Sequence, residues 1–402
     1  MNRLKLGFGL CLISIFLGGC WDRLEIEDRA VVLGISIDEA DEQDAEAESN
    51  ISHKNDSFVP PKIDKMRITA QIAVPGRIPL GPEKGGGTVQ IPVWVVQATG
   101  HTIDDAMMNL QQQISDQLFF GHLRVIVLSE AVAKKGIESI SSYFRRNSEV
   151  RRLTWMMVSE GKAEHTMNVA PPLERVPALY LLATLDHAVQ MGKFPNDFLG
   201  IYWITSSSKG RDPYLPYIRI RGKENIEIAG LAYFSGDKMV GVTSPLEIGF
   251  FMAIKGMNPG GYSAFVRVPG IERSIMFRTT HRKSSTQLTI QNGKPHFKVR
   301  LSLEGNLEEK STETFSLTEP GILDQIEQYL SREAKKSYTS LIATTQRKGS
   351  DIFGFGEYVR AKAPAYWNRH IKTSEAWHEM YKEITVDIEP ILKIRRVGMK
   401  SS

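Results

Sequence analysis

The sequence predicts a multi-domain protein of the α+β or mixed α/β class, in which mixed sheets are flanked by helices. Its 402 residues are too many for one compact core. In the first half, apolar runs of strand length alternate with helical segments, and this order builds parallel crossovers. In the second half, a series of strands precedes one long helix.

The elements of the first half follow one another at short intervals. Strands are expected at residues 30–38, 67–74, 93–98, 123–128 and 153–158, and helices at 102–118, 130–146 and 174–191. Thr102 is the expected N-cap of the first helix, with Asp105 three residues later, as in a capping box. An acidic, polar loop at 39–56 and a loop rich in Pro and Gly at 75–87 separate the first three strands.

The second half opens with a hairpin signal, in which two apolar runs flank Ser235-Gly236-Asp237. Strands are expected at 226–234, 238–242, 264–268, 275–282, 287–291, 297–303 and 384–389, and helices at 245–255 and 319–347. The last helix is the longest, and its apolar residues recur at a spacing of three to four, so one face should pack on a sheet.

We therefore expect four segments along the chain. They are a leader at 1–19, an N-terminal α/β region at 20–200 that includes a smaller second domain, a linker or domain boundary at 201–225, and a C-terminal α/β domain at 226–402.

The first twenty residues have the layout of a bacterial lipoprotein signal peptide. Arg3 and Lys5 precede an apolar stretch at 6–17, and Leu17-Gly18-Gly19-Cys20 has the form of a lipobox. Cleavage is expected between Gly19 and Cys20. Cys20 is then the lipidation site, through an S-diacylglycerol and an N-acyl chain such as palmitate, although the sequence leaves the N-acyl chain open. The apolar stretch is too short to span a bilayer, whereas two acyl chains anchor a protein durably.

The first strand should lie close to this anchor. About ten residues separate Cys20 from the strand at 30–38, and they reach at most ~35 Å. The acidic strip Asp22, Glu25, Glu27 and Asp28 is either a solvated linker or a contact for a partner at the membrane.

Composition excludes several classes of function. A formal net charge of +4 is no electrostatic footprint for nucleic acid. Of the two cysteines, Cys11 leaves with the leader and Cys20 is lipidated, so we expect no disulfide and no cysteine metal site. We expect no other metal and no cofactor, because the nine histidines show no ligand spacing.

No enzyme motif of useful specificity occurs. Ser206 and Lys209 match S-x-x-K, but Gly210 and Pro213 follow where the motif should open a helix, and K-T-G is missing. We expect a solvated loop there.

Two aromatic segments near the C-terminus are predicted to be structural. Gly354-Phe355-Gly356 should be a turn after the long helix, pinned by Phe353 and Phe355, with a binding surface as the alternative. Tyr366, Trp367, Trp377 and Tyr381 should form core between the last helices and the sheet, with a partner or membrane surface as the alternative.

Ordered blocks along the whole chain resemble the Ger(x)C family, the C subunits of spore germinant receptors. The blocks are 19–28, 34–38, Arg267-Val268-Pro269-Gly270, Thr280-His281-Arg282, 351–357, Pro364-Ala365-Tyr366-Trp367 and 394–398. One departure is Ser36, where a second Gly is expected, and the acidic loop at 39–56 is longer than usual.

This resemblance implies a non-enzymatic subunit with three α/β domains, lipid-anchored on the outer face of the spore inner membrane. It implies two integral membrane partners, the A and B subunits of the same receptor, in a complex that triggers germination. No catalytic residue carries over, and Cys20 is the one functional residue that does.

Two other functions stay open at this stage. One is a solute-binding lipoprotein of a transporter, which should have a cleft between two lobes. The other is a cell-wall enzyme that uses Ser206 and Lys209. The sequence names no germinant and leaves open whether this chain binds one directly.

Overall fold

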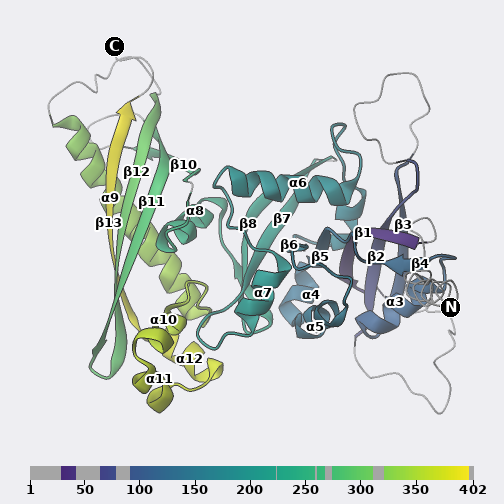
Figure 1. The fold of residues 1–402 in the computed structure, drawn as a ribbon. Coiled ribbons are helices and arrows are strands. Elements are labelled where there is room, and N and C mark those ends of the chain that lie inside the picture. Colours follow the sequence, from purple (N-terminus) through teal and green to yellow (C-terminus); the bar gives the residue numbers. More distant parts are fainter. Residues whose placement is uncertain are drawn as a thin grey trace, which may run out of the picture.

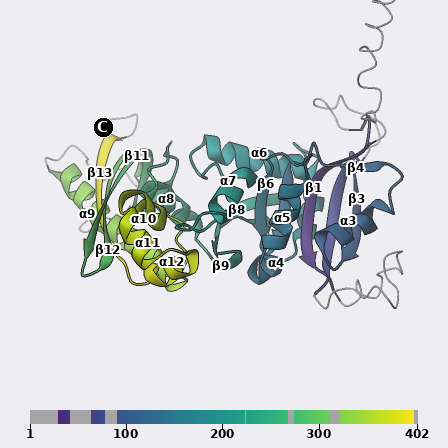
Figure 2. The ribbon, with the colours of Figure 1, turned by 60° about the horizontal axis from the view of Figure 1, so that its bottom comes forward.

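The computed structural model describes residues 29–41, 64–77, 91–222, 224–258, 260–267, 274–310 and 321–397. The described chain is elongated and contains two sheets, the first from strands within residues 29–242 and the second from strands within residues 263–397 (Figures 1 and 2). Helices flank both sheets, so the predicted fold class is confirmed. No helix within the described ranges combines the length and the apolar character that crossing a bilayer requires.

The first sheet has nine strands. They are β1 (Arg29–Glu39), β2 (Met66–Ala73), β3 (Val93–Gly100), β4 (Gln117–Phe119), β5 (Val125–Ser129), β6 (Trp155–Ser159), β7 (Tyr214–Arg221), β8 (Asn225–Ser235) and β9 (Lys238–Val242). The order is β3-β2-β1-β5-β6-β7-β8-β9, and β4 pairs with the start of β1. β1, β5, β6 and β7 are parallel, while β2, β3, β8 and β9 extend the sheet in antiparallel pairs. The predicted parallel crossover is confirmed.

The helices of this half are α3 (Ile103–Gln111), α4 (Glu130–Lys135), α5 (Glu138–Arg146), the 3-10 helix η2 (Ala163–Asn168), α6 (Pro177–Gln190) and α7 (Leu199–Ser206). The predicted cap of α3 is confirmed, since Thr102 accepts a hydrogen bond from the Asp105 N–H.

Two helix predictions in this half were wrong in detail, and one helix was missed. The helix expected to reach 118 ends at Gln111, because Gln117–Phe119 pairs with β1 as a strand. The helix expected at 130–146 is two helices, separated at Gly136, whose φ of 126° an α-helix cannot continue. α7 was not predicted, because its sequence is apolar on nearly every side and has no helical period.

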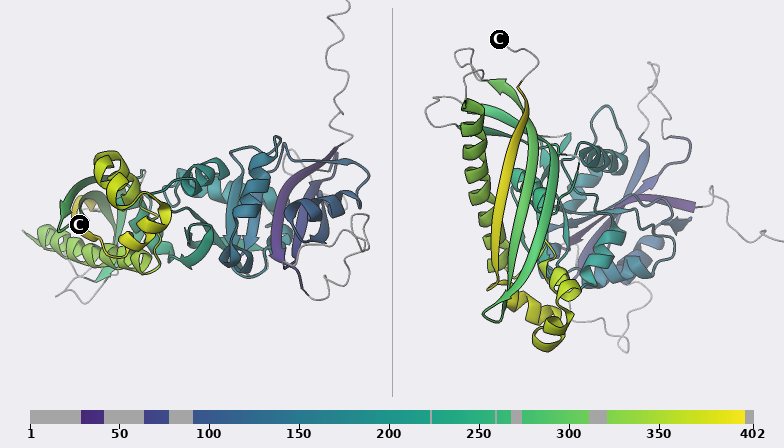
Figure 3. Two further views of the ribbon diagram at one scale, coloured as in Figure 1. Left: turned by 90° about the horizontal axis from the view of Figure 1, so that it is seen from below. Right: turned by 60° about the vertical axis from the view of Figure 1, so that its left-hand side comes forward.

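The second sheet has the order β10-β11-β12-β13. Its strands are β10 (Ser263–Arg267), β11 (Ser274–Gln291), β12 (Lys294–Lys310) and β13 (Thr385–Val397), and its helices are α8 (Pro245–Ile254), α9 (Ile322–Arg347), α10 (Phe355–Lys362), α11 (Pro364–His370) and α12 (Ser374–Tyr381). β11 is one long strand where two were expected. β13 pairs in parallel with β12, and the long helix α9 runs along β13, as predicted for its apolar face (Figure 3).

The two sheets share an apolar core. One cluster of buried side chains extends from Trp155 of the first sheet through Phe251 of α8 to Leu301 and Leu392 of the second sheet. A second cluster, which includes Ile126 and Phe144, lies among residues of the first half and the hairpin β8–β9. Trp367, Trp377 and Tyr381 are buried in the first cluster and Tyr366 packs against it, so their predicted place in the core is confirmed.

Residues 201–225, expected as a linker or boundary, hold the end of α7 and all of β7. β7 pairs with β6 on one side and β8 on the other, so the first sheet continues through this segment. The limits of the domains therefore stay a prediction.

Candidate functional site

The lipidation site predicted from the sequence, Cys20 with the cleavage point at Gly19, lies outside the described residues. The description begins at Arg29, the first residue of β1. β1 lies inside the first sheet, where it pairs with β2, β4 and β5. About nine residues join Cys20 to that strand, a reach of roughly 30 Å at most.

The described hydrogen bonds do not join Ser206 to Lys209, because the Ser206 hydroxyl is bonded within α7. Ser206 is the last residue of α7 rather than part of a loop, and its hydroxyl donates to the Trp203 carbonyl at 3.3 Å. Ser207 and Ser208 donate in the same way to carbonyls one turn earlier, at 2.8 and 2.9 Å. These serines satisfy the end of a helix, and Ser206 and Lys209 are exposed side chains at its tip.

A buried polar cluster joins the two halves of the molecule. We call it the carboxylate joint, made of Asp212, Asp351, Trp377 and His378. Asp351 accepts hydrogen bonds from the N–H groups of Gly354 (2.8 Å) and Gly356 (2.9 Å) and from the Trp377 indole (3.0 Å).

Asp212 holds the joint to the first half. Its carboxylate accepts from the Asp351 N–H at 2.8 Å and from the Gly236 N–H at 2.9 Å, and its Oδ1 lies 2.8 Å from Nε2 of His378. The Asp212 N–H donates to the Asp351 carbonyl at 2.9 Å. Segments more than a hundred residues apart in sequence are thereby fastened together.

The joint also depends on close backbone approach. The Glu357 N–H donates to the Gly210 carbonyl at 2.8 Å. A Cβ placed on Gly356 would lie 2.5 Å from Cε2 of Trp377, so only glycine fits there. Gly354 has a φ of 80°. The segment 354–356, predicted as a turn, is instead the start of α10, with Gly354 as the N-cap, and the N–H groups of Gly354 and Gly356 donate to Asp351.

Burial and charge shift the pKa values of the joint. Burial raises the pKa of Asp351 to about 6, although N–H groups of Gly356, Phe355 and Gly354 hold it lower than burial alone would. Burial by itself lowers the pKa of His378, but its hydrogen bond to Asp212 and the charges of Asp212, Glu375 and Asp351 outweigh burial, so the pKa is raised. The carboxylates of Asp351 and Asp212 are thus satisfied by donors from the chain itself.

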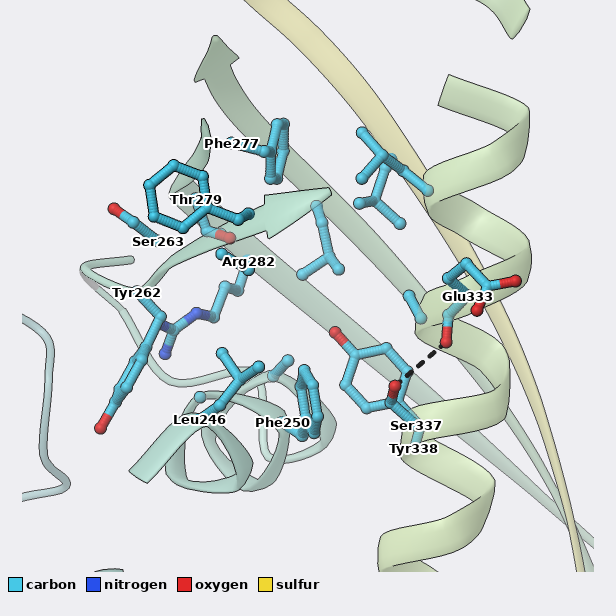
Figure 4. Close-up of a pocket in the computed structure, with 18 of the residues that line it drawn as sticks. Leu246, Phe250, Tyr262, Ser263, Phe277, Thr279, Arg282, Glu333, Ser337 and Tyr338 are labelled. Carbon is cyan, nitrogen blue, oxygen red and sulfur yellow. Dashed lines mark hydrogen bonds between the residues drawn. The ribbon is translucent and has the colours of Figure 1, made fainter. Parts of the chain in front are cut away.

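A cavity lies in the second half, among α8, β10, β11 and α9 (Figure 4). Its volume is about 280 Å³. The lining is mostly apolar and aromatic, with one buried cation: Leu246, Phe250, Tyr262, Phe265, Phe277, Arg282, Leu303, Leu330, Ser337 and Tyr338 are among the lining residues. We call it the Arg282 pocket.

No cluster of three or more His, Cys, Asp or Glu side chains with metal-binding geometry occurs within the described ranges. Sequence reasoning found neither the joint nor the pocket as a site. The available signals were two of the ordered blocks. The block at 351–357 contains Asp351 of the joint, and the block at 280–282 contains Arg282 of the pocket. The partners come from distant segments that carry no motif.

Two family descriptions match this chain. "Spore germination protein N-terminal domain" matches residues 22–220, and "Spore germination B3/GerAC like, C-terminal" matches residues 229–398.

Curated relatives extend over nearly the full chain. The putative spore germination protein YfkR of Bacillus subtilis (strain 168) is 27% identical, over 96% of this chain and 95% of its own. Spore germination protein KC of the same organism is 24% identical, over 98% and 96%. The crystal structure of the GerBC protein superposes with a TM-score of 0.56 at 19% identity, and covers 85% of this chain and 95% of its own. That similarity shows a shared fold.

Proposed function

This chain belongs to the spore germination GerAC family, and from that premise we propose that it is a lipid-anchored, non-enzymatic C subunit of a nutrient germinant receptor, required for the germination response. The observation that carries the proposal is the family match across both halves of the chain. The lipobox supports the anchor, and the satisfied hydrogen bonds of Ser206 support a role without catalysis.

We further propose the surroundings in which it works. The chain is held by lipid at Cys20 on the outer face of the spore inner membrane, beside integral membrane subunits A and B of the same receptor. The short stretch between Cys20 and β1 supports docking close to the bilayer. The genes next to this one provide a direct check, because two adjacent genes for multi-span proteins are expected.

The decisive variant is Cys20→Ala, and the chain supplies its own control in Cys11→Ala. Both cysteines lie in the first twenty residues, but only Cys20 is the proposed lipid acceptor. We expect Cys20→Ala spores to lose the chain from the membrane fraction and to respond weakly to nutrients, while Cys11→Ala spores behave as wild type. The measurements are an immunoblot of the membrane fraction and the fall in optical density after nutrient addition. A normal response from Cys20→Ala spores would rule out the anchoring proposal.

The alternative, a solute-binding lipoprotein of a transporter, has weaker support. Such a protein closes two lobes around a cleft, whereas here the two halves share one apolar cluster and the carboxylate joint. The Arg282 pocket lies inside the second half and not between the halves.

A further inference from the structure

We propose that the Arg282 pocket binds a small organic carboxylate with an apolar tail, and that the Arg282 guanidinium holds the carboxylate. This inference goes beyond the proposed function, since a receptor subunit can act in assembly without a ligand of its own. It depends on the size and walls of the cavity, the state of Arg282, and the groups at the cavity mouth.

The walls suit an apolar tail. Aromatic and aliphatic side chains from α8, β11 and α9 surround the space, among them Phe250, Phe277 and Tyr338 (Figure 4). The volume of about 280 Å³ lies near the lower end of ligand sites, roughly 300–1,000 Å³. The cavity therefore suits a small molecule rather than a peptide.

Arg282 is a buried cation with weak compensation. Its residue is only 4% exposed. Its guanidinium donates to two backbone carbonyls, Met257 at 3.3 Å and Gly192 at 3.5 Å, both long for such bonds. Within the described part of the chain, no ion pair joins it to a carboxylate. Burying a charge is costly unless an opposite charge meets it, and a guanidinium has five donors to satisfy.

The nearest acidic side chain of the lining does not supply that charge. Glu333 of α9 lines the cavity, but its carboxylate pairs with Lys336 at 2.7 Å and points away from Arg282 (Figure 4). The Tyr338 hydroxyl, by contrast, points into the cavity (Figure 4). The Arg282 guanidinium lies beside Tyr262 (Figure 4), and its planar fork matches the carboxylate of a ligand.

The mouth of the cavity is open to an apolar molecule. Leu246 of α8 and Phe265 of β10 line it and are 38% and 66% exposed. Exposed apolar side chains around a concave site are typical of ligand entry. A ligand with its acid group at Arg282 would place its tail between these walls.

The test is isothermal titration of the full chain in lipid nanodiscs. The probes are phenylacetate and 4-methylpentanoate, with phenylacetamide as the neutral match and inorganic phosphate as the simple anion. We expect saturable heat with the two carboxylates and at least about tenfold weaker binding of the amide, because a charge-assisted hydrogen bond is lost. Phosphate should give no heat in the same range.

Three variants tie the heat to the pocket. Arg282→Gln should remove carboxylate binding. Arg278→Gln is the matched control, an arginine of the same strand that pairs with Glu308 outside the cavity, and should bind as wild type. Ser337→Phe fills the cavity from α9 and leaves Arg282 in place. It should also remove carboxylate binding, and it therefore tests the site even if Arg282→Gln does not fold.

The outcomes separate clearly. Equal affinity for phenylacetate and its amide would overturn the role of Arg282, and no heat with any probe would overturn the site. Binding of phosphate as tight as that of phenylacetate would show an anion site without carboxylate preference and would also contradict the proposal. None of these results bears on Cys20→Ala, so the proposed function stands or fails separately.

Discussion

Asp351 shows how much one buried carboxylate can organise. It accepts three hydrogen bonds, from Gly354, Gly356 and the Trp377 indole, and its own N–H is held by Asp212. Its place after the long helix was visible in the sequence as part of an ordered block. Its partner Asp212 was not, because it lies 139 residues away in the sequence and belongs to none of those blocks.

Replacing Asp351 should be severe. Asp351→Ala leaves the two glycine N–H groups and the indole N–H buried without an acceptor. We expect the free energy of unfolding to fall by about 3–5 kcal/mol. Urea unfolding of the full chain measures this loss of stability. Glu379→Ala is the control, since this exposed acid of α12 pairs on the surface with Lys382, the C-cap of that helix, and it should change stability by less than about 1 kcal/mol.

His378 gives the joint a pH dependence of known sign. Its pKa is raised in the folded protein, so its contribution to stability is present below the unfolded pKa and is lost as pH rises through the folded pKa. We expect the stability advantage of wild type over His378→Gln to be larger at about pH 6 than at about pH 8.5. An advantage that grows with pH would contradict this sign. His281→Gln, an exposed histidine of β11, is the control.

At the scale of elements, the prediction from sequence succeeded where the hydrophobic period was clear. The parallel run β1, β5, β6, the hairpin β8–β9 and the helix α9 all follow from local patterns. α3 was predicted too long because the pairing of Gln117–Phe119 with β1 is a tertiary contact that local propensity does not contain. β11 was predicted as two short strands because its middle, residues 283–286, is polar, and β12 was predicted too short because residues 304–310 are mostly polar.

The hairpin turn between β11 and β12 depends on the backbone conformation of one residue, Gly293. Asn292 and Gly293 have φ of 51° and 76°, the conformation that an Asn-Gly hairpin turn provides. No atom would lie within 4 Å of a Cβ at Gly293, so the effect of a side chain there is conformational alone. We expect Gly293→Ala to cost about 1–2 kcal/mol, measured by urea unfolding. Gln291→Ala, at the exposed end of β11, should cost less than about 0.5 kcal/mol.

At the scale of the whole molecule, the shared core predicts cooperative unfolding. Because one apolar cluster runs from Trp155 to Leu392, opening one half exposes the apolar surface of the other. We expect the best-protected amides of β6 and β12 to exchange hydrogen at the same rate in moderate urea, as followed by mass spectrometry. Two clearly separate exchange rates would show that the halves unfold independently.

The short stretch before β1 predicts a dependence on distance from the membrane. An insert of ~20 flexible residues after Asp22 adds a long reach to the tether without touching the described fold. We expect the insert to weaken the nutrient response while the chain stays in the membrane fraction. The same insert after Ser402 is the control and should have little effect. A full response with the first insert would contradict close docking.

The parallel pairing of β13 with β12 has a consequence for biosynthesis. The ribosome makes every other strand of the second sheet before β13. Helices α9 to α12 are made between β12 and its parallel partner β13. Until the ribosome has delivered β13, the outer edge of β12 is an unpaired template that another chain can join. A premature stop codon that removes only β13 would therefore release a nearly complete polypeptide in which one edge of β12 is unpaired and open to another chain. We expect such a chain to be degraded by proteolytic quality control rather than to act as a subunit.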